Sequence, residues 1–136
     1  MSQKLINALY TKLTLDQTSG SLYDDLGGRV YFGKAPDNSS LPLLIFDLIT
    51  SDVQNSFGGS RVDTARFQID LYGSIKLGAV AIGNIETKLF SLIDSVTITA
   101  TDYDNVSVAC ASRSQRSMGD EAHRIVSEYE LIGSAS

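Results

Sequence analysis

The feature that most limits the possible folds is the alternation of apolar and polar residues in "ARFQIDLYGS". The apolar positions are Ala65, Phe67, Ile69 and Leu71, and the polar positions between them are Arg66, Gln68, Asp70 and Tyr72. A period of two places successive side chains on opposite faces of a strand, so the stretch predicts a strand with one buried and one wetted face. Such a strand needs a sheet that is covered on one side.

Two other stretches have apolar residues at helical spacing, and helices formed there would cover one side of the sheet. Residues 2–17, "SQKLINALYTKLTLDQ", predict a helix that ends near Thr14, and residues 75–93 predict a long amphipathic helix. Their apolar stripes are Leu5, Ile6, Leu9 and Leu13, and Leu77, Ala81, Ile85, Leu89 and Leu92. A short helical turn from Leu22 to Leu26 is closed by Gly27 and Gly28, because glycine tolerates the left-handed end of a helix.

Further strands are predicted on both sides of the long helix. "RVYF" is a brief strand, and "LLIFDLIT" follows Pro42, which lacks an amide donor and fits the start or edge of a strand. In "LLIFDLIT" the predicted core face is Leu44, Phe46 and Leu48, and the other face is Ile45, Asp47 and Ile49. The last third predicts two strands, with alternating Val106, Val108 and Cys110 and alternating Ile125, Ser127, Tyr129 and Leu131. Loops are expected at residues 33–42, 50–60 and 112–122, the last with a turn at Met118, Gly119 and Asp120.

The predicted element order is α, short α, β, β, β, α, β, β. This order indicates an α+β fold in which the helices cover one face of a largely antiparallel sheet. We expect residues 1–136 to form one domain, since a chain of 136 residues buries a core without disulfides or metal.

Charge and hydropathy exclude several classes of function. The net charge of −5 argues against nonspecific nucleic-acid binding, which needs a clustered basic face. The longest apolar run, from Leu41 to Phe46, is far shorter than the ~20 residues of a membrane span. The N-terminus lacks the order of a signal peptide, so we expect synthesis and retention in the cytoplasm and no membrane partner.

No group of residues predicts catalysis, a metal site or a cofactor. The single histidine, His123, has no identifiable nucleophile partner and is interpreted as a surface residue near a strand start. The single cysteine, Cys110, is interpreted as a small buried thiol. Asp102 and Asp104 lack the glycine and glutamate of a calcium loop and indicate a turn. Arg113 and Arg116 form the only local basic spot, in a serine-rich predicted loop.

The order of several segments resembles one protein family. The segments are the N-terminal helix, "GGRVYFGKAP", the proline-led apolar strand, "RFQIDLYG", the amphipathic helix and the terminal "HRIVSEYEL" strand. Together they resemble the tail completion, or tail terminator, proteins of long-tailed bacteriophages over nearly the whole chain. The resemblance implies a non-enzymatic virion protein without a cofactor, which forms a ring, typically a hexamer, at the head-proximal end of the tail. The ring would stop growth of the tail tube and join the tail to the head.

The implied partners are further copies of the chain, the tail tube protein and a head connector or stopper protein, with DNA only as cargo through the lumen. An acidic lumen would let DNA pass without sticking. The family offers no signature site, so candidate interface residues come from the predicted loops and their borders: Asp52, Phe57, Arg61, Arg113, Arg116 and Met118. The strand after Pro42 is a further candidate, since Ile45 and Ile49 suit either cover by a neighbouring copy or burial under the chain's own helices.

Two other interpretations stay open. Another head–tail joining protein, such as an adaptor or connector-ring subunit, shares the size and the ring. A small ligand-binding domain would instead be monomeric or dimeric, with an apolar pocket lined by converging polar groups.

Overall fold

The structure is a computed structural model that describes residues 2–36, 39–55, 61–74, 79–118 and 122–135. Three helices and six strands lie in these ranges: α1 (Ser2–Thr14), α2 (Leu22–Asp25), β1 (Val30–Phe32), β2 (Leu43–Asn55), β3 (Arg61–Ser74), α3 (Ala79–Ile93), β4 (Val96–Ile98), β5 (Tyr103–Met118) and β6 (Ala122–Ala135). The strands form one sheet in the order β1-β2-β3-β6-β5-β4. Only the β1–β2 pair is parallel.

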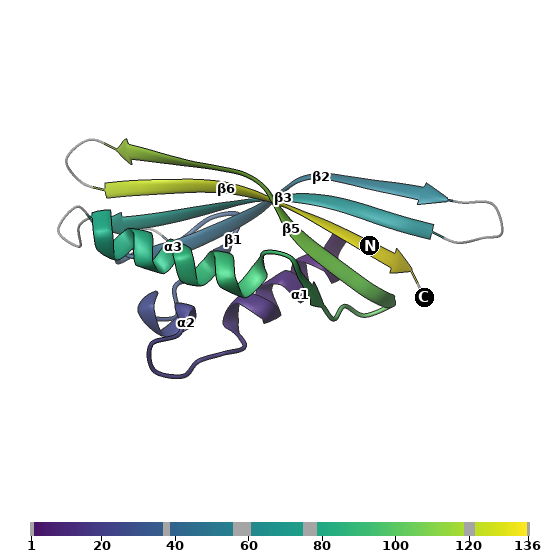
Figure 1. Cartoon of the computed structure of the whole chain (residues 1–136), viewed down its shortest axis with the longest axis horizontal. Helices are drawn as coiled ribbons and strands as arrows, with labels where there is room; N and C mark the ends of the chain where they lie inside the picture. Colours follow the sequence, from purple (N-terminus) through teal and green to yellow (C-terminus); the bar gives the residue numbers. More distant parts are fainter. Residues whose placement is uncertain (1, 37–38, 56–60, 75–78, 119–121, 136) are drawn as a thin grey trace.

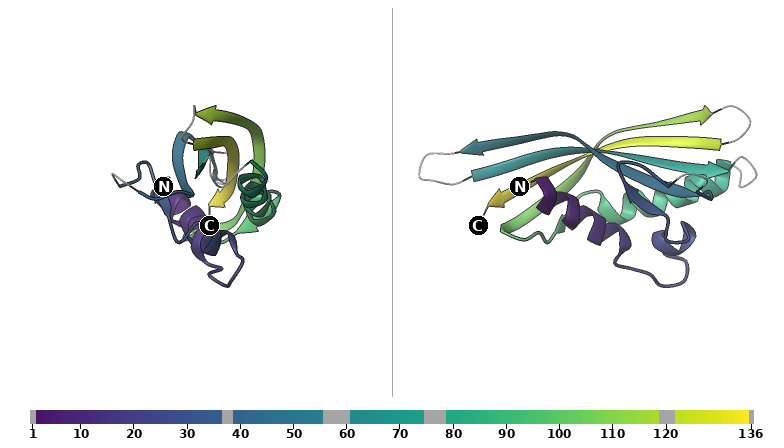
Figure 2. Two further views of the ribbon diagram at one scale, coloured as in Figure 1. Left: turned by 90° about the vertical axis from the view of Figure 1, so that its left-hand side faces the viewer. Right: turned by 180° about the vertical axis from the view of Figure 1, so that it is seen from behind.

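The sheet is long and curled, and all three helices lie on its concave side (Figures 1 and 2). The view along the long axis shows the sheet wrapping around this side, with α1 and α3 closing the open part of the curl (Figure 2). The β2–β3 pair extends past the helices at one end of the molecule, whereas at the other end the β5–β6 pair reaches about as far as the start of α3 (Figure 1). The predicted α+β class, with helices on one face of a largely antiparallel sheet, is confirmed.

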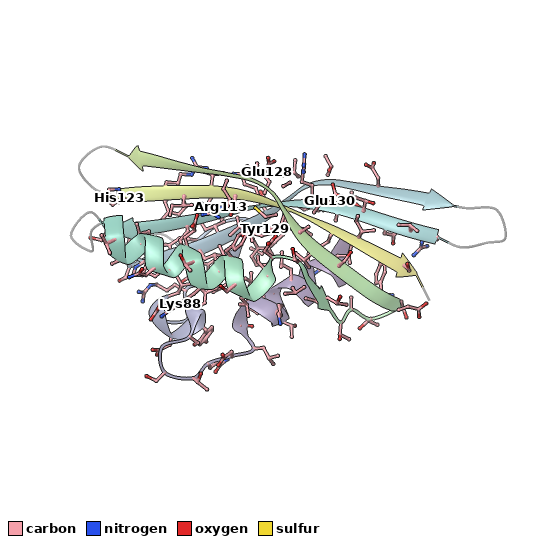
Figure 3. The ribbon with its side chains drawn as sticks, viewed as in Figure 1. Lys88, Arg113, His123, Glu128, Tyr129 and Glu130 are labelled. Carbon is pink, nitrogen blue, oxygen red and sulfur yellow. The ribbon has the colours of Figure 1, made fainter. Side chains whose placement is uncertain are left out.

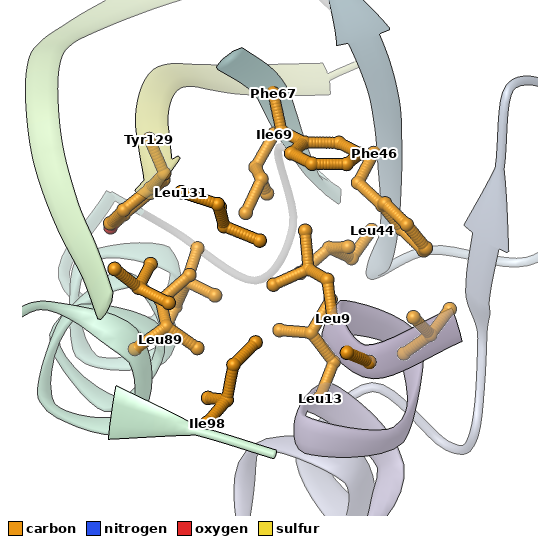
Figure 4. Packing of buried hydrophobic residues seen from close by; sticks show 14 of the residues in the cluster. Leu9, Leu13, Leu44, Phe46, Phe67, Ile69, Leu89, Ile98, Tyr129 and Leu131 are labelled. Carbon is orange, nitrogen blue, oxygen red and sulfur yellow. The ribbon is translucent and has the colours of Figure 1, made fainter. Parts of the chain in front are cut away.

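The core lies between the helices and the concave face of the sheet (Figure 4). The predicted strand faces are confirmed: Leu44, Phe46, Phe67, Ile69 and Leu71 have no exposed surface. Helix α1 contributes Leu5, Leu9 and Leu13. Phe46 is central among the rings, with centroids 5.2 Å from Phe32 and 6.3 Å from Phe67.

The stripe predicted for the long helix is corrected in part. Ile85 and Leu89 are buried as expected, but Ala81 and Leu92 are only half-buried, while Ile82 and Ile93 complete the buried face. The described part of the helix is Ala79–Ile93, and the predicted start at residue 75 lies outside the described residues. Gly73 and Ser74, before it, are still paired in β3 with His123 and Ala122. Gly73 suits this strand position, since a Cβ there would lie 2.5 Å from the Cδ1 of Ile82. Leu77 lies outside the described residues.

Both predicted interface loops are wrong over most of their described length. Residues 50–55 belong to β2 and residues 112–118 to β5, each paired along its length with a neighbouring strand. Both parts are polar and lack the alternation that predicts a strand. Residues 50–55 extend past the helices, whereas residues 112–118 lie at the end where α3 begins (Figure 1). The short strand β4 was also not predicted; its Val96–Ile98 pairs with β5.

Candidate interface surfaces

Two strands continue well beyond their edge neighbours. Strand β1 pairs with β2 from Leu44 to Phe46, and β4 pairs with β5 from Val106 to Val108. Farther along, the described ladder pairs β2 with β3 alone and β5 with β6 alone. We call residues 52–55 the β2 tail and residues 112–118 the β5 tail. The two tails point to opposite ends of the molecule (Figure 1).

Each strand makes the same two features where its edge neighbour stops. On β2, the Leu48 N–H donates to Asp47 Oδ1 at 2.9 Å, and the register with β3 shifts between Leu48 and Thr50. On β5, the Cys110 N–H donates to Asp94 Oδ1 at 2.8 Å, and the register with β6 shifts between Cys110 and Ser112. In each strand, a carboxylate therefore accepts the hydrogen bond of the first outward-pointing N–H beyond the edge strand. The bulge that follows adds local twist.

A buried polar cluster lies at the base of the β2–β3 end. Asp63 of β3 is 2% exposed and accepts a hydrogen bond from the Tyr103 hydroxyl at the start of β5. Arg61 Nη2 donates to Asp63 Oδ2 at 3.4 Å, and Arg61 Nε lies 3.3 Å from Oδ1. The predicted interface residue Arg61 thus neutralises a carboxylate of its own chain. Extending the alternation back from Ala65 places Asp63 on the inner face, which is the signal that could have found it.

This cluster predicts a loss of stability in alkali. Burial, and then the hydrogen bond to Asp63, raise the pKa of Tyr103 from 10.0 to about 12. The unfolded chain therefore releases this proton first, so the stabilisation is complete below pH 10.0 and is lost as pH rises toward about 12. Burial raises the pKa of Tyr129 as well, which acts in the same direction. The free energy of unfolding, measured with denaturant between pH 10.0 and about 12, should fall more steeply with pH for the unchanged protein than for Tyr103→Phe. Equal slopes would contradict the assignment of this pKa to Tyr103.

The base of the β5 tail is fastened to helix α3. Arg113 donates to both carboxylate oxygens of Glu86, at 2.5 and 3.1 Å, and its guanidinium lies 4.9 Å from the centre of the Phe90 ring. Figure 3 shows Arg113 on the side of α3 that faces the sheet. The paired geometry and the ring contact hold the strand against the helix. Arg113 therefore contacts its own chain rather than extending from a loop as predicted.

The face of the sheet away from the helices, which we call the outer face, carries a polar network. Arg124 Nη2 donates to Asp70 Oδ2 at 3.0 Å and lies over the Tyr72 ring at 5.6 Å. Ser112 Oγ donates to Glu128 Oε2 at 2.9 Å. Among the described strand positions of this face, acidic residues outnumber basic ones: Asp47, Asp52, Asp70, Glu128 and Glu130 against Arg66, Arg116 and Arg124.

A cleft of about 360 Å³ lies where α1, α2 and α3 meet. Leu13, Leu22 and Leu92 supply its apolar lining. Its cation, Lys88, donates to the Gly20 carbonyl oxygen at 2.7 Å and pairs with Asp25, so its charge is already compensated. Asp16, Ser21 and Thr87 also line the cleft and are bonded within the chain, to Thr18, Asp24 and Gly83. Polar groups that are already bonded are less free to orient a ligand, which does not favour a binding pocket here.

The predicted interface residues divide between the two ends. Asp52 is exposed on the β2 tail, and Arg61 lies near it at the start of β3. Arg113, Arg116 and Met118 belong to β5 at the far end, although the side chains of Arg116 and Met118 are not described. Phe57 lies outside the described residues. Ile45 is half-buried and Ile49 is 43% exposed, so the chain's own helices do not bury the second face of β2.

Chemistry-bearing residues do not gather into a catalytic or metal site within the described ranges. No group of three or more metal-ligating side chains occurs there. His123 is half-buried on β6, opposite Gly73 and Ser117. Asp102 has a positive φ of 67° and forms an ion pair with Lys4, in agreement with the predicted turn. None of the described helices combines the length and apolar character needed to cross a bilayer.

Solved structures share this fold, although sequence comparisons give no relative. No family model matches the chain, and no curated protein matches it. A chain of the virion of a native gene transfer agent particle superposes with a TM-score of 0.75 at 15% identity, over 98% of this chain and 97% of its own length. A second solved chain gives a TM-score of 0.64, also at 15% identity, over 98% and 96%. The likeness thus covers nearly the full length of the chains compared.

Proposed function

We propose that this protein is a structural subunit of a phage-like virion that forms a ring, typically a hexamer, at the head-proximal end of a tail. There it ends growth of the tail tube and joins the tail to the head, without enzymatic activity. The observation that carries the proposal is the fold likeness, over nearly the full length of both chains, to a chain of a gene transfer agent virion. The order of segments along the chain, which resembles that of tail terminator proteins, supports a place at the head-proximal end of the tail.

The shape of the subunit supports repeated contact between copies. Contacts around a ring use two different patches on each copy, and these patches must lie apart on the subunit. The β2 and β5 tails are such patches, since they lie on opposite edges of the sheet and at opposite ends. The remaining surfaces would contact the tail tube protein on one side of the ring and a connector or stopper protein on the other.

The outer face of the sheet suits a channel for DNA. It carries more acidic than basic residues, and its arginine at position 124 is already paired with Asp70. An acidic surface repels the phosphate backbone, so DNA can pass through the channel without binding to its wall. A ring structure in which Lys and Arg line the channel would overturn this part of the proposal.

The cleft near α2 does not favour the ligand-binding alternative. Such a domain needs polar groups free to meet a ligand, and the cation of this cleft, Lys88, is engaged by Asp25 and Gly20.

The purified full chain, with and without preformed tail tubes, tests the proposal by mass measurement and negative-stain imaging. We expect closed rings, or rings capping one end of each tube, and tubes that no longer elongate when tube protein is added. Rings that bind connectors but leave tubes growing would assign the protein to the connector instead. A monomer at all concentrations that leaves tubes uncapped would contradict the proposal.

A further inference from the structure

We infer that neighbouring copies join by antiparallel pairing of the β2 tail of one copy with the β5 tail of the next, with Val53 opposite Gln115 and Asp52 opposite Arg116. The inference rests on the proposed function and names the contact that would close its ring. Its four grounds are the direction of the outward backbone groups, the strand directions, the register and the charges.

Hydrogen bonds at the edge strands fix which backbone groups point outward. The Phe46 carbonyl accepts from Gly33 N–H at 2.9 Å, so Phe46 faces away from β3. Backbone groups alternate in direction along an antiparallel pair. Following the register with β3 through the bulge, the backbone N–H and C=O groups of Val53 and Asn55 point away from β3, toward the open edge of the sheet. The same reasoning applies to β5, where the Cys110 N–H donates to Asp94 and therefore points away from β6. Following the register through the bulge, the backbone groups of Arg113, Gln115 and Ser117 also point away from β6, toward the open edge.

The strand directions allow the sheet to continue from copy to copy. Between β2 and β5 in the sheet lie β3 and β6, and every pair in this series is antiparallel. Strands β2 and β5 therefore run in opposite directions. When the next copy follows in the same orientation, its β5 lies antiparallel to β2 without being turned over. The result is a head-to-tail contact, the kind that generates rings.

One register satisfies all of these conditions. Pairing Val53 with Gln115 also pairs Asn55 with Arg113, so outward groups meet outward groups at both positions. Asp52 then lies directly opposite Arg116 in a non-hydrogen-bonded pair, where cross-strand side chains are closest. Both residues belong to the outer face: Asp52 pairs with Thr64, Arg116 pairs with Arg124 opposite Tyr72, and Thr64 and Tyr72 share one face of β3.

The short edge strands leave room for this contact and limit it. Strand β1 ends its pairing at Phe46 and β4 at Val108, so neither overlaps the paired tails in this register. The carboxylates of Asp47 and Asp94 accept hydrogen bonds from the N–H groups of Leu48 and Cys110, which precede the two tails. The register of the two paired tails therefore cannot shift by many residues toward β1 or β4.

Charge favours this contact over two-fold alternatives. The charged residues of β2 are Asp47 and Asp52, whereas the β5 tail contains Arg113 and Arg116. Two β2 tails would bring carboxylates together, and two β5 tails would bring guanidinium groups together, both of which are unfavourable. Arg113 is already paired with Glu86, so Arg116 is the cation that would meet Asp52.

Disulfide trapping tests the register in the full chain. In a Cys110→Ala background, Asp52→Cys and Arg116→Cys are combined in one chain, and mild oxidation is applied under ring-forming conditions or on tail tubes. Directly opposed positions of this kind are close enough for a disulfide. We expect a ladder of covalent oligomers on a non-reducing gel. Each single variant, and the pair Asp52→Cys with Asp104→Cys outside the β5 tail, should stay unlinked.

The outcomes separate this inference from the proposed function. Covalent dimers from Asp52→Cys alone would overturn it in favour of a two-fold β2 contact. Rings seen by imaging without the ladder would overturn the pairing and leave the ring intact. Absence of both rings and tube capping for the unmodified chain would overturn the proposed function, and the pairing with it.

Discussion

Phe67→Ala should lower the free energy of unfolding by about 3–5 kcal/mol, the cost of removing a fully buried aromatic ring and leaving a cavity. Phe67 has no exposed surface, and its ring packs on Phe46, between the sheet and the helices. The loss would weaken the contact that holds the centre of the curled sheet to its cover. Urea unfolding of the purified variant, followed by circular dichroism, gives the value.

Phe32→Ala is the matched control. Phe32 contacts the same partner, Phe46, at 5.2 Å, but is 44% exposed on the edge strand β1. Its truncation should cost only about 1 kcal/mol, since much of its surface already meets water. Equal losses for the two variants would contradict a core centred on β2 and β3.

The covered centre of the fold was predictable from the sequence because one face of each strand there meets the helices. Phe67 and Ile69 alternate with polar residues, and the alternation places them correctly on the concave face. The helices followed from their apolar spacing for the same reason. The end of β3 was not predictable in this way, because Gly73 and Ser74, which favour a break, are held in β3 by pairing with β6.

The two tails were not predictable from a local sequence pattern. Residues 52–55 and 112–118 have polar sequences without alternation, and such sequences are typical of loops. Their strand structure depends on hydrogen bonds to β3 and β6, which a local pattern does not reveal. The bulges after Leu48 and Cys110 depend on register between separate strands and left no sequence signal either.

The candidate interface residues stay predictions, and the structure changes the basis for several of them. Asp52 and Arg116 were chosen as loop positions, and their proposed role now depends on strand register. Arg61 and Arg113 were chosen as positions in or beside predicted loops, but each compensates a carboxylate of its own chain, Asp63 and Glu86 respectively. Glu86 lies 27 residues from Arg113 in the sequence. Asp63 is only two residues from Arg61 but precedes the alternating stretch from which β3 was predicted.

Reversing the charges of the tails gives the second large effect. Asp52→Arg and Arg116→Asp should each weaken association between copies by about tenfold per contact, because an opposite-charge pair becomes a like-charge pair. The effect multiplies around a ring, since every junction carries the same pair. The double variant Asp52→Arg with Arg116→Asp restores opposite charges at each junction and should recover most of the association.

The control and the measurement follow from the same geometry. Asp104→Arg makes the same change of charge at an exposed position of β5 outside the tail, so it should leave association nearly unchanged. Mass photometry across a concentration series, with circular dichroism to verify folding, measures the ring fraction of all four variants. Added salt should narrow the differences, because screening weakens an exposed pair. A double variant that associates more weakly than either single variant would show that Asp52 and Arg116 do not meet, since only directly opposed charges compensate each other when both are reversed.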